Sequence, residues 1–271
     1  MTDRSGSRVL VTGGSGFIGR RLVRALLADG AEVTSVDLKP FPVPDVPVKT
    51  VPGDIRDPSV VERSIQPGTD CVIHLAAVTS VLKSIEDPAR TYEVNVGATA
   101  SLLERCRQAG VPGFVLASTN AVTGDVGHSV ITERVPLRPL TPYGATKAAG
   151  EMMLSAYAGS YGMSCASLRF SNVYGPGMEA KDSFVPRLMR AARDSQGVQI
   201  YGDGTQLRDL VHVDDIIAGI LTAWDAGHSG PLILGAGDGA PIPAEQIPPK
   251  PGYDLNAGIA TVWPEFSEAS K

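Results

Sequence analysis

The stretch VTGGSGFIG at residues 11–19 constrains the fold of this chain more than any other feature. It follows the apolar run RVLVTG (8–13), typical of a buried strand, and precedes RRLVRALLADG (20–30), whose apolar residues recur at helical spacing. Glycine permits a tight turn and lets backbone N–H groups approach a pyrophosphate, which a helix N-terminus then stabilises. Gly13, Gly16 and Gly19 therefore predict a strand–turn–helix unit that binds a dinucleotide, with a purely structural glycine turn as the alternative.

Asp37 indicates which dinucleotide is bound. It ends the next predicted strand, EVTSVD (32–37), 18 residues after Gly19. A carboxylate at this position accepts hydrogen bonds from both ribose hydroxyls, whereas it would repel a 2′-phosphate. The sequence therefore favours NAD over NADP.

Strand and helix patterns alternate along most of the chain. This alternation predicts an α/β fold, a doubly wound parallel sheet of the Rossmann type with helices on both faces. We expect an NAD-binding domain at 1–175, with 200–227 contributing, and a smaller, discontinuous substrate-binding subdomain at 176–271. The predicted strands are 8–13, 32–37, 48–55, 71–77, 113–119 and 164–175, and the predicted helices are 20–30, 88–110, 143–158, 182–196 and about 216–227.

Composition excludes several classes of partner. A net charge of −5 gives no overall field that would hold nucleic acid or an anionic membrane. The three cysteines have no metal-ligand spacing and are typical of buried apolar residues in a reducing compartment, and the histidines are scattered, so we expect no metal site. A strand begins within a few residues of Met1 and no apolar run reaches membrane-spanning length, so we expect a cytoplasmic protein.

Tyr143 and Lys147 stand four residues apart in TPYGATKAAGE and would share one face of a helix. A free tyrosine titrates near 10 and is a poor base at neutral pH. A lysine ammonium about 4 Å away would favour the phenolate by roughly 4 kcal/mol at an effective dielectric constant near 20. We therefore expect Lys147, with the positive ring of NAD, to lower the pKa of Tyr143, so that Tyr143 takes a proton from a substrate hydroxyl. Two side chains that share a helix face by chance are the alternative.

Several stretches together resemble the extended short-chain dehydrogenase/reductase family, the NAD-dependent nucleotide-sugar epimerases and dehydratases. They occur in family order over about residues 8–225. They are TGGSGFIG, GDIRD (53–57), HLAA (74–77), YEVNVGAT (92–99), YGATK (143–147), RFSNVYGPG (169–177) and YGDGTQLRDLVHVDD (201–215).

The resemblance implies a set of site residues. It implies a catalytic triad of Thr119, Tyr143 and Lys147. It implies cofactor contacts from Gly13, Gly16, Phe17, Ile18, Gly19, Asp37, Asp54, Ile55, Leu75, Ala76, Ala77, Asn95, Tyr143 and Lys147. Asp54 and Ile55 would flank the adenine, and Asn95 would brace the active-site helix. It implies substrate contacts from Thr79, Ser80, Thr119, Asn120, Asn172, Val185, Tyr201 and Arg208.

Two departures from the family pattern bear on the reaction. The sugar 4,6-dehydratases of this family usually follow the catalytic Thr with Asp-Glu, where this chain has Asn120 and Ala121. Neither side chain carries a proton at neutral pH, so dehydration is disfavoured. Thr123 replaces a tyrosine common in the family, whereas TSVLKSIEDP (79–88) resembles the hexose 4-epimerase branch.

We therefore expect an NAD-dependent nucleotide-sugar C4 epimerase acting on a UDP-glucose/galactose- or UDP-glucuronate-type substrate. A sugar dehydrogenase or reductase and a non-catalytic NAD-binding regulator are the alternatives. The resemblance implies a homodimer through the helices at 88–110 and 143–158. The last part of the chain departs from the family, and we expect segments to be missing near 239/240 and 252/253.

Overall fold

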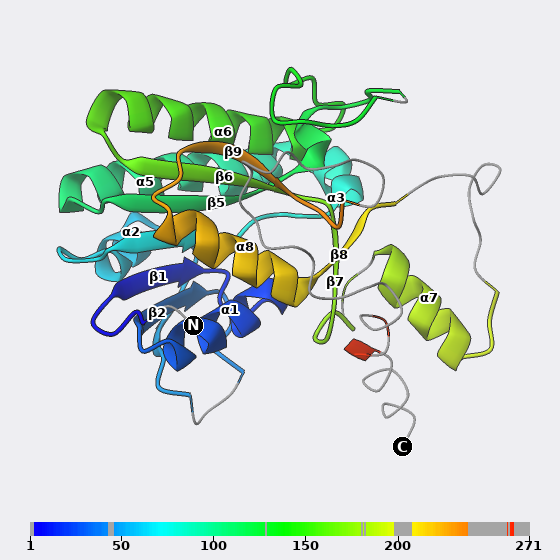
Figure 1. The fold of residues 1–271 in the computed structure, drawn as a ribbon, viewed down its shortest axis with the longest axis horizontal. Helices are drawn as coiled ribbons and strands as arrows, with labels where there is room; N and C mark the ends of the chain where they lie inside the picture. The colour runs from blue at the N-terminus through cyan, green and yellow to red at the C-terminus, as the bar shows by residue number, and fades with distance from the viewer. Residues whose placement is uncertain are drawn as a thin grey trace.

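The computed structural model describes residues 3–42, 46–127, 129–179, 181, 183–197, 208–237, 259 and 261–262. Seven strands form one sheet in the order β3-β2-β1-β4-β5-β6-β9, and every neighbouring pair is parallel (Figure 1). The predicted doubly wound parallel sheet is confirmed. The strands are β1 (Arg8–Thr12), β2 (Glu32–Asp37), β3 (Lys49–Pro52), β4 (Cys71–His74), β5 (Gly113–Thr119), β6 (Ser164–Phe170) and β9 (Gly230–Leu234).

Helices cover both faces of this sheet, as Figure 1 shows. The main helices are α1 (Phe17–Ala28), α2 (Pro58–Ser64), α5 (Ala98–Ala109), α6 (Pro142–Tyr161) and α8 (Val213–Asp225). Alternate residues of β1 enter two separate cores, because successive strand side chains point to opposite faces. Val9 and Val11 pack with α1 and α8, whereas Leu10 packs with α2, α5 and α6. Because helices cover both faces of the sheet, we look for the site at the ends of its strands.

The long helix predicted at 88–110 is interrupted. Its first turn is α4 (Pro88–Tyr92), a π-helical segment follows at Glu93–Gly97, and α5 then runs to Ala109. A separate short helix, α3 (Val81–Glu86), precedes it. Single π turns inside α-helices are frequent at functional sites. The interruption places Asn95 in the π segment.

The strand predicted at 164–175 also divides. After β6 ends, β7 (Asn172–Tyr174) leaves the main sheet and pairs in parallel with β8 (Leu210–His212) as a separate two-stranded sheet. In Figure 1 this small sheet and α7 (Phe184–Arg193) lie beyond the ends of the main-sheet strands, on the right. The seventh strand, β9, comes from within 176–271, so the range expected to form the smaller subdomain also contributes to the main sheet. The division into domains at 175 stays a prediction.

The three cysteine thiols are buried and unpaired, as expected. Within the part of the chain that the structure describes, no helix combines the length and the hydrophobicity that a membrane crossing needs. The two expected missing segments, near 239/240 and 252/253, lie outside the described residues.

Candidate active site

The glycine loop lies where the strand order reverses, between β1 and β4, at the carboxyl ends of the strands. Gly13 has φ +72°, and a Cβ there would lie 2.8 Å from the backbone N of Ala76. A Cβ on Gly19 would lie 2.1 Å from the carbonyl oxygen of Gly13. Helix α1 begins at Phe17 and Ile18, and its first turn has neither a side-chain cap on Gly16 nor an acidic residue. Close backbone approach and a helix N-terminus without a neighbouring carboxylate in that turn fit a pyrophosphate.

Asp37 reaches the edge of this loop from the end of β2. Its carboxylate accepts hydrogen bonds from the backbone N–H of Ser15, at 3.1 Å, and from the backbone N–H of Lys39, also at 3.1 Å. These two bonds fix the carboxylate beside the glycine turn. Its remaining lone pairs suit the hydroxyls of a ribose, as the sequence predicts.

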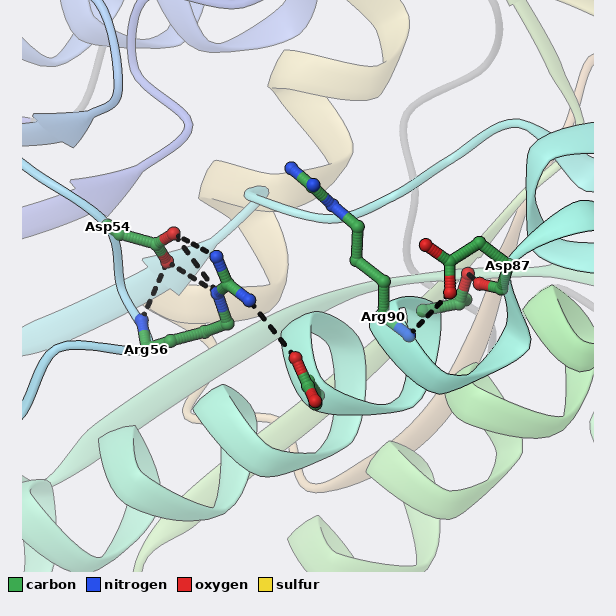
Figure 2. Close-up of polar contacts among 6 residues, drawn as sticks. Asp54, Arg56, Asp87 and Arg90 are labelled. Carbon is green, nitrogen blue, oxygen red and sulfur yellow. Dashed lines mark hydrogen bonds and ion pairs between the residues drawn. The ribbon is translucent and has the colours of Figure 1, made fainter.

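Asp54, predicted to flank the adenine, belongs to a charged network that Figure 2 shows. Arg56 donates to its carboxylate from Nη2 at 2.7 Å, and the same guanidinium reaches Glu93 of the π segment at 3.1 Å. The Arg56 hydrogen bond lowers the pKa of Asp54, and the charge of Arg90 contributes in the same direction. Ile55, the next predicted adenine contact, is buried. The network ties the loop after β3 to the segment that carries Asn95.

The loop after β4 holds the predicted contacts at 75–77, all half-buried, directly beside Gly13. The Asn95 side chain makes two hydrogen bonds to the backbone of Val78, the next residue of this loop. Its Oδ1 accepts from the Val78 N–H at 2.8 Å, and its Nδ2 donates to the Val78 carbonyl at 3.0 Å. Nδ2 also donates to the hydroxyl of Thr146 on α6 at 3.0 Å. Asn95 thus connects this loop (residues 75–78, the predicted cofactor loop) to the helix that carries Tyr143.

The predicted triad residues come from two neighbouring elements. Thr119 ends β5, and Tyr143 lies in the first turn of α6, where its backbone N–H donates to the Ser84 hydroxyl of α3 at 3.2 Å. The Thr119 oxygen accepts from the backbone N–H of Ala121, which leaves its hydroxyl proton for another partner. A hydrogen bond with Thr119 lowers the pKa of Tyr143, so the structure brings these two side chains together. Lys147 lies one turn further along α6 and is 4% exposed.

The protonation of this pair differs from the expectation. Burial raises the pKa of Tyr143 to about 12, although the Thr119 hydrogen bond lowers it in part. Burial also lowers the pKa of Lys147 to about 8. The expected lowering of the Tyr143 pKa by Lys147 is therefore wrong for the chain alone, because the cost of removing water from the phenolate outweighs the Thr119 hydrogen bond, and the charge of Lys147 is not among the causes of the shift.

The residues after Thr119 form a short 3₁₀ turn, Asn120–Val122. The side-chain oxygen of Asn120 is buried, and among the described residues it has no hydrogen-bond partner. Thr123 points inward, is 2% exposed, and donates from its hydroxyl to the Asn120 carbonyl at 2.8 Å. Asn120 therefore presents an unsatisfied acceptor beside the triad.

The predicted substrate contacts just before α3, Thr79 and Ser80, have different surroundings. Thr79 is exposed, whereas Ser80 is the N-cap of α3 and accepts from the backbone N–H of Lys83 at 3.3 Å. The Ser80 hydroxyl thus has a local structural partner, and this bond explains its position without a ligand.

The other predicted substrate contacts come from beyond the main sheet. Asn172 is exposed at the start of β7, and its side-chain Nδ2 donates to the Asp209 carbonyl at 3.1 Å. Asp209 directly follows Arg208, the other predicted diphosphate contact, in the sequence. Val185 is buried on α7. Tyr201 lies outside the described residues. Parallel pairing places Phe170 opposite Thr119, so Asn172 follows β6 at the same carboxyl end of the sheet where Thr119 ends β5.

Sequence patterns missed a buried ion pair beneath the triad. Glu151, one turn after Lys147, accepts from Arg169 of β6 at 2.7 Å and from the Ser118 hydroxyl. Both charged side chains are nearly inaccessible, at 6% and 3% exposed. In the sequence, the only signal for Glu151 is that it stands four residues after Lys147 on α6. That spacing does not predict Arg169 as its partner. Within the described residues, no cluster of His, Cys, Asp and Glu could hold a metal ion.

Comparison with known proteins places this geometry in a family. Residues 9–234 match the model of the NAD dependent epimerase/dehydratase family. A dTDP-glucose 4,6-dehydratase from Streptomyces griseus is 35% identical over 254 residues, which cover 89% of this chain and 76% of that protein. A putative UDP-glucose 4-epimerase from Methanocaldococcus jannaschii is also 35% identical, over 79% of this chain and 72% of its own.

Solved structures agree in fold. A UDP-glucose 4-epimerase from Thermotoga maritima, solved with UDP-glucose, superposes with a TM-score of 0.87 at 27% identity, covering 97% of this chain and 100% of its own. The protein MoeE5, solved with UDP-glucose and NAD, has a TM-score of 0.85 at 32% identity, with 97% and 99% covered. The glycine cradle and Asp37 fit the NAD on which this family depends. The chain belongs to the NAD-dependent epimerase/dehydratase family, whose members act on nucleotide-sugars.

Proposed function

We propose that this protein is an NAD-dependent nucleotide-sugar C4 epimerase that acts through a 4-keto sugar. The observation that carries the proposal is the pair Asn120–Ala121 after Thr119, in the 3₁₀ turn beside the triad. An amide and a methyl group cannot exchange a proton at neutral pH. Tyr143 then has to serve as both base and acid, which suits reversible oxidation of one carbon better than elimination of water.

The proton at the sugar hydroxyl would pass to Tyr143. With a pKa of about 12, the phenolate costs about 7 kcal/mol at pH 7 in the chain alone. Lys147, with a pKa of about 8, stays mostly charged at pH 7 and would be available to hold the cofactor ribose. Bound NAD supplies the hydride acceptor and a positive ring that favours the phenolate. The Thr119 hydroxyl would hold the reacting oxygen, and Asn120 offers a buried acceptor for a second sugar hydroxyl.

The roles predicted for the remaining site residues are part of this proposal. Asp37 would bind the adenosine ribose, Asp54 and Ile55 would flank the adenine, and Asn172 with Arg208 would bind the substrate diphosphate. The similarity to proteins solved with UDP-glucose supports a UDP-linked sugar. A homodimer through α5 and α6 is also proposed, and the exposed Met152 on α6 supports it. Light scattering of the purified chain tests it, and a monomeric mass would refute it.

A 4,6-dehydratase is the second candidate, because relatives of that name reach 35% identity. The decisive experiment is proton NMR of UDP-glucose, UDP-galactose and UDP-glucuronate incubated with the wild type and with Tyr143→Phe. We expect the wild type to form the C4 epimer and Tyr143→Phe to lose at least about 100-fold of the rate, the usual contribution of acid–base catalysis. A new C6 methyl signal would indicate dehydration instead, and accumulation of NADH would indicate a dehydrogenase. Equal epimerisation by both proteins would refute the role of Tyr143.

A further inference from the structure

His74 ends β4 between the cofactor loop and the π segment, and its ring is 1% exposed. Both ring nitrogens have a threonine partner: Nδ1 lies 2.6 Å from the Thr12 hydroxyl, and Nε2 lies 3.0 Å from the Thr99 hydroxyl. Because a neutral imidazole has one donor and one acceptor, the partners decide which nitrogen carries the proton.

Thr99 settles that assignment. Its hydroxyl donates to the carbonyl oxygen of Asn95 at 2.7 Å, and a carbonyl can only accept. The single hydroxyl proton of Thr99 is thereby used, so its oxygen accepts from His74. The proton of His74 is on Nε2, and Nδ1 is an acceptor.

The hydrogen bonds on the Nδ1 side of His74 run in the same direction as those on the Nε2 side. With Nδ1 an acceptor, the Thr12 hydroxyl donates to it. The Thr12 oxygen in turn accepts from the backbone N–H of Ala76 at 3.2 Å. Ala76 lies against Gly13, which follows Thr12 in the chain. One end of the chain of hydrogen bonds is therefore the predicted cofactor loop.

The other end continues through the Asn95 side chain. Asn95 donates from Nδ2 to the Thr146 hydroxyl, and that hydroxyl donates to the backbone carbonyl of Tyr143 at 2.7 Å. The direction is again unambiguous, since the Tyr143 carbonyl can only accept. Hydrogen bonds of consistent direction thus join the cofactor loop, His74, the π segment and α6.

We infer that His74 is a positioning residue, neutral with its proton on Nε2, that couples the cofactor loop at Ala76 through Asn95 to the placement of Tyr143. The hydrogen-bond chain does not depend on the proposed function; only its effect on catalysis rests on the proposed role of Tyr143. Burial, with a smaller contribution from the charge of Lys147, lowers the pKa of His74 to about 3, which keeps the ring neutral at pH 7. A buried network with every member satisfied fixes one arrangement of its elements.

The test combines ¹⁵N NMR of the histidine ring with NAD affinity by calorimetry. Thr99→Val removes the hydroxyl and nearly keeps the side-chain volume, whereas Thr99→Ser keeps the hydroxyl. Thr91→Val is the matched control, because Thr91 is also 1% exposed and its hydroxyl donates to the carbonyl of Asp87 four residues earlier, as in Thr99. No hydrogen bond joins Thr91 to a histidine among the described residues.

We expect the wild type and Thr99→Ser to show a neutral His74 with the proton on Nε2 at pH 7. In Thr99→Val the proton should move to Nδ1, where Thr12 is the remaining acceptor, and NAD should bind about tenfold more weakly. Thr91→Val should retain the wild-type tautomer and affinity. A wild-type ring that is charged or protonated on Nδ1 would overturn the inference, as would Thr99→Val with unchanged tautomer and affinity. If Thr99→Val does not fold, the wild-type tautomer still decides, because a ring that is charged or protonated on Nδ1 refutes the inference. None of these measurements depends on which reaction the enzyme catalyses.

Discussion

Replacing Lys147 by methionine should change how the stability of the protein depends on pH. Lys147 is 4% exposed on α6, and burial lowers its pKa from 10.5 to about 8. Below pH 8 the folded protein carries a buried ammonium that the unfolded chain hydrates freely, so the charge destabilises the folded state. Between pH 8 and 10.5 the folded lysine is neutral while the unfolded lysine still binds its proton. Stability therefore rises with pH across this window.

The magnitude follows from the size of the shift. A difference of about 2.5 pH units corresponds to about 3 kcal/mol of destabilisation at pH 7, at about 1.4 kcal/mol per unit. At pH 9.5 more than half of this penalty has disappeared, so the wild type should gain about 2 kcal/mol over pH 7. Lys147→Met has no proton to lose and should not show this gain.

Urea unfolding of both proteins at pH 7.0 and pH 9.5 measures the effect. We expect the free-energy difference between Lys147→Met and the wild type to shrink by about 2 kcal/mol at the higher pH. Lys83→Met, at an exposed position of α3, is the control and should differ equally from the wild type at both pH values. A Lys147→Met difference that is the same at pH 7.0 and 9.5 would refute the buried-charge reasoning.

Two further predictions concern the cradle and the support of the site. Gly19→Ala would place a methyl group 2.1 Å from a carbonyl oxygen of the glycine loop, so NAD affinity should fall at least tenfold. An unchanged affinity in calorimetry would contradict the proposal that this loop binds the pyrophosphate of NAD. Glu151→Gln would leave the Arg169 charge buried without its counter-charge, at a cost of about 3–5 kcal/mol in urea unfolding. Glu104→Gln breaks the far more accessible ion pair with Arg107 and should cost much less, so an equal loss in both variants would show that burial does not matter here.

Local patterns in the sequence determined the fold class and the positions of the main chemical groups. The glycine spacing, Asp37 at a strand end and the apolar strands depend on interactions within a few residues, so period and turn chemistry predict them. The helix at 88–110 was predicted without its π segment, and the strand at 164–175 without its division. Both depend on distant partners: Asn95 bonds to Val78 and Thr146, and β7 pairs with β8.

Tertiary structure alone decided the electrostatics and the connections of the site. The sequence places Lys147 one helical turn from Tyr143 and so predicts a lowered tyrosine pKa. Burial reverses the sign, because the fold removes the water that would hydrate the phenolate. The partners of His74 are likewise 62 and 25 residues away, so spacing along the chain could not reveal them. A sequence states which groups are present, whereas their protonation and orientation depend on the desolvation and hydrogen bonds that the folded chain imposes.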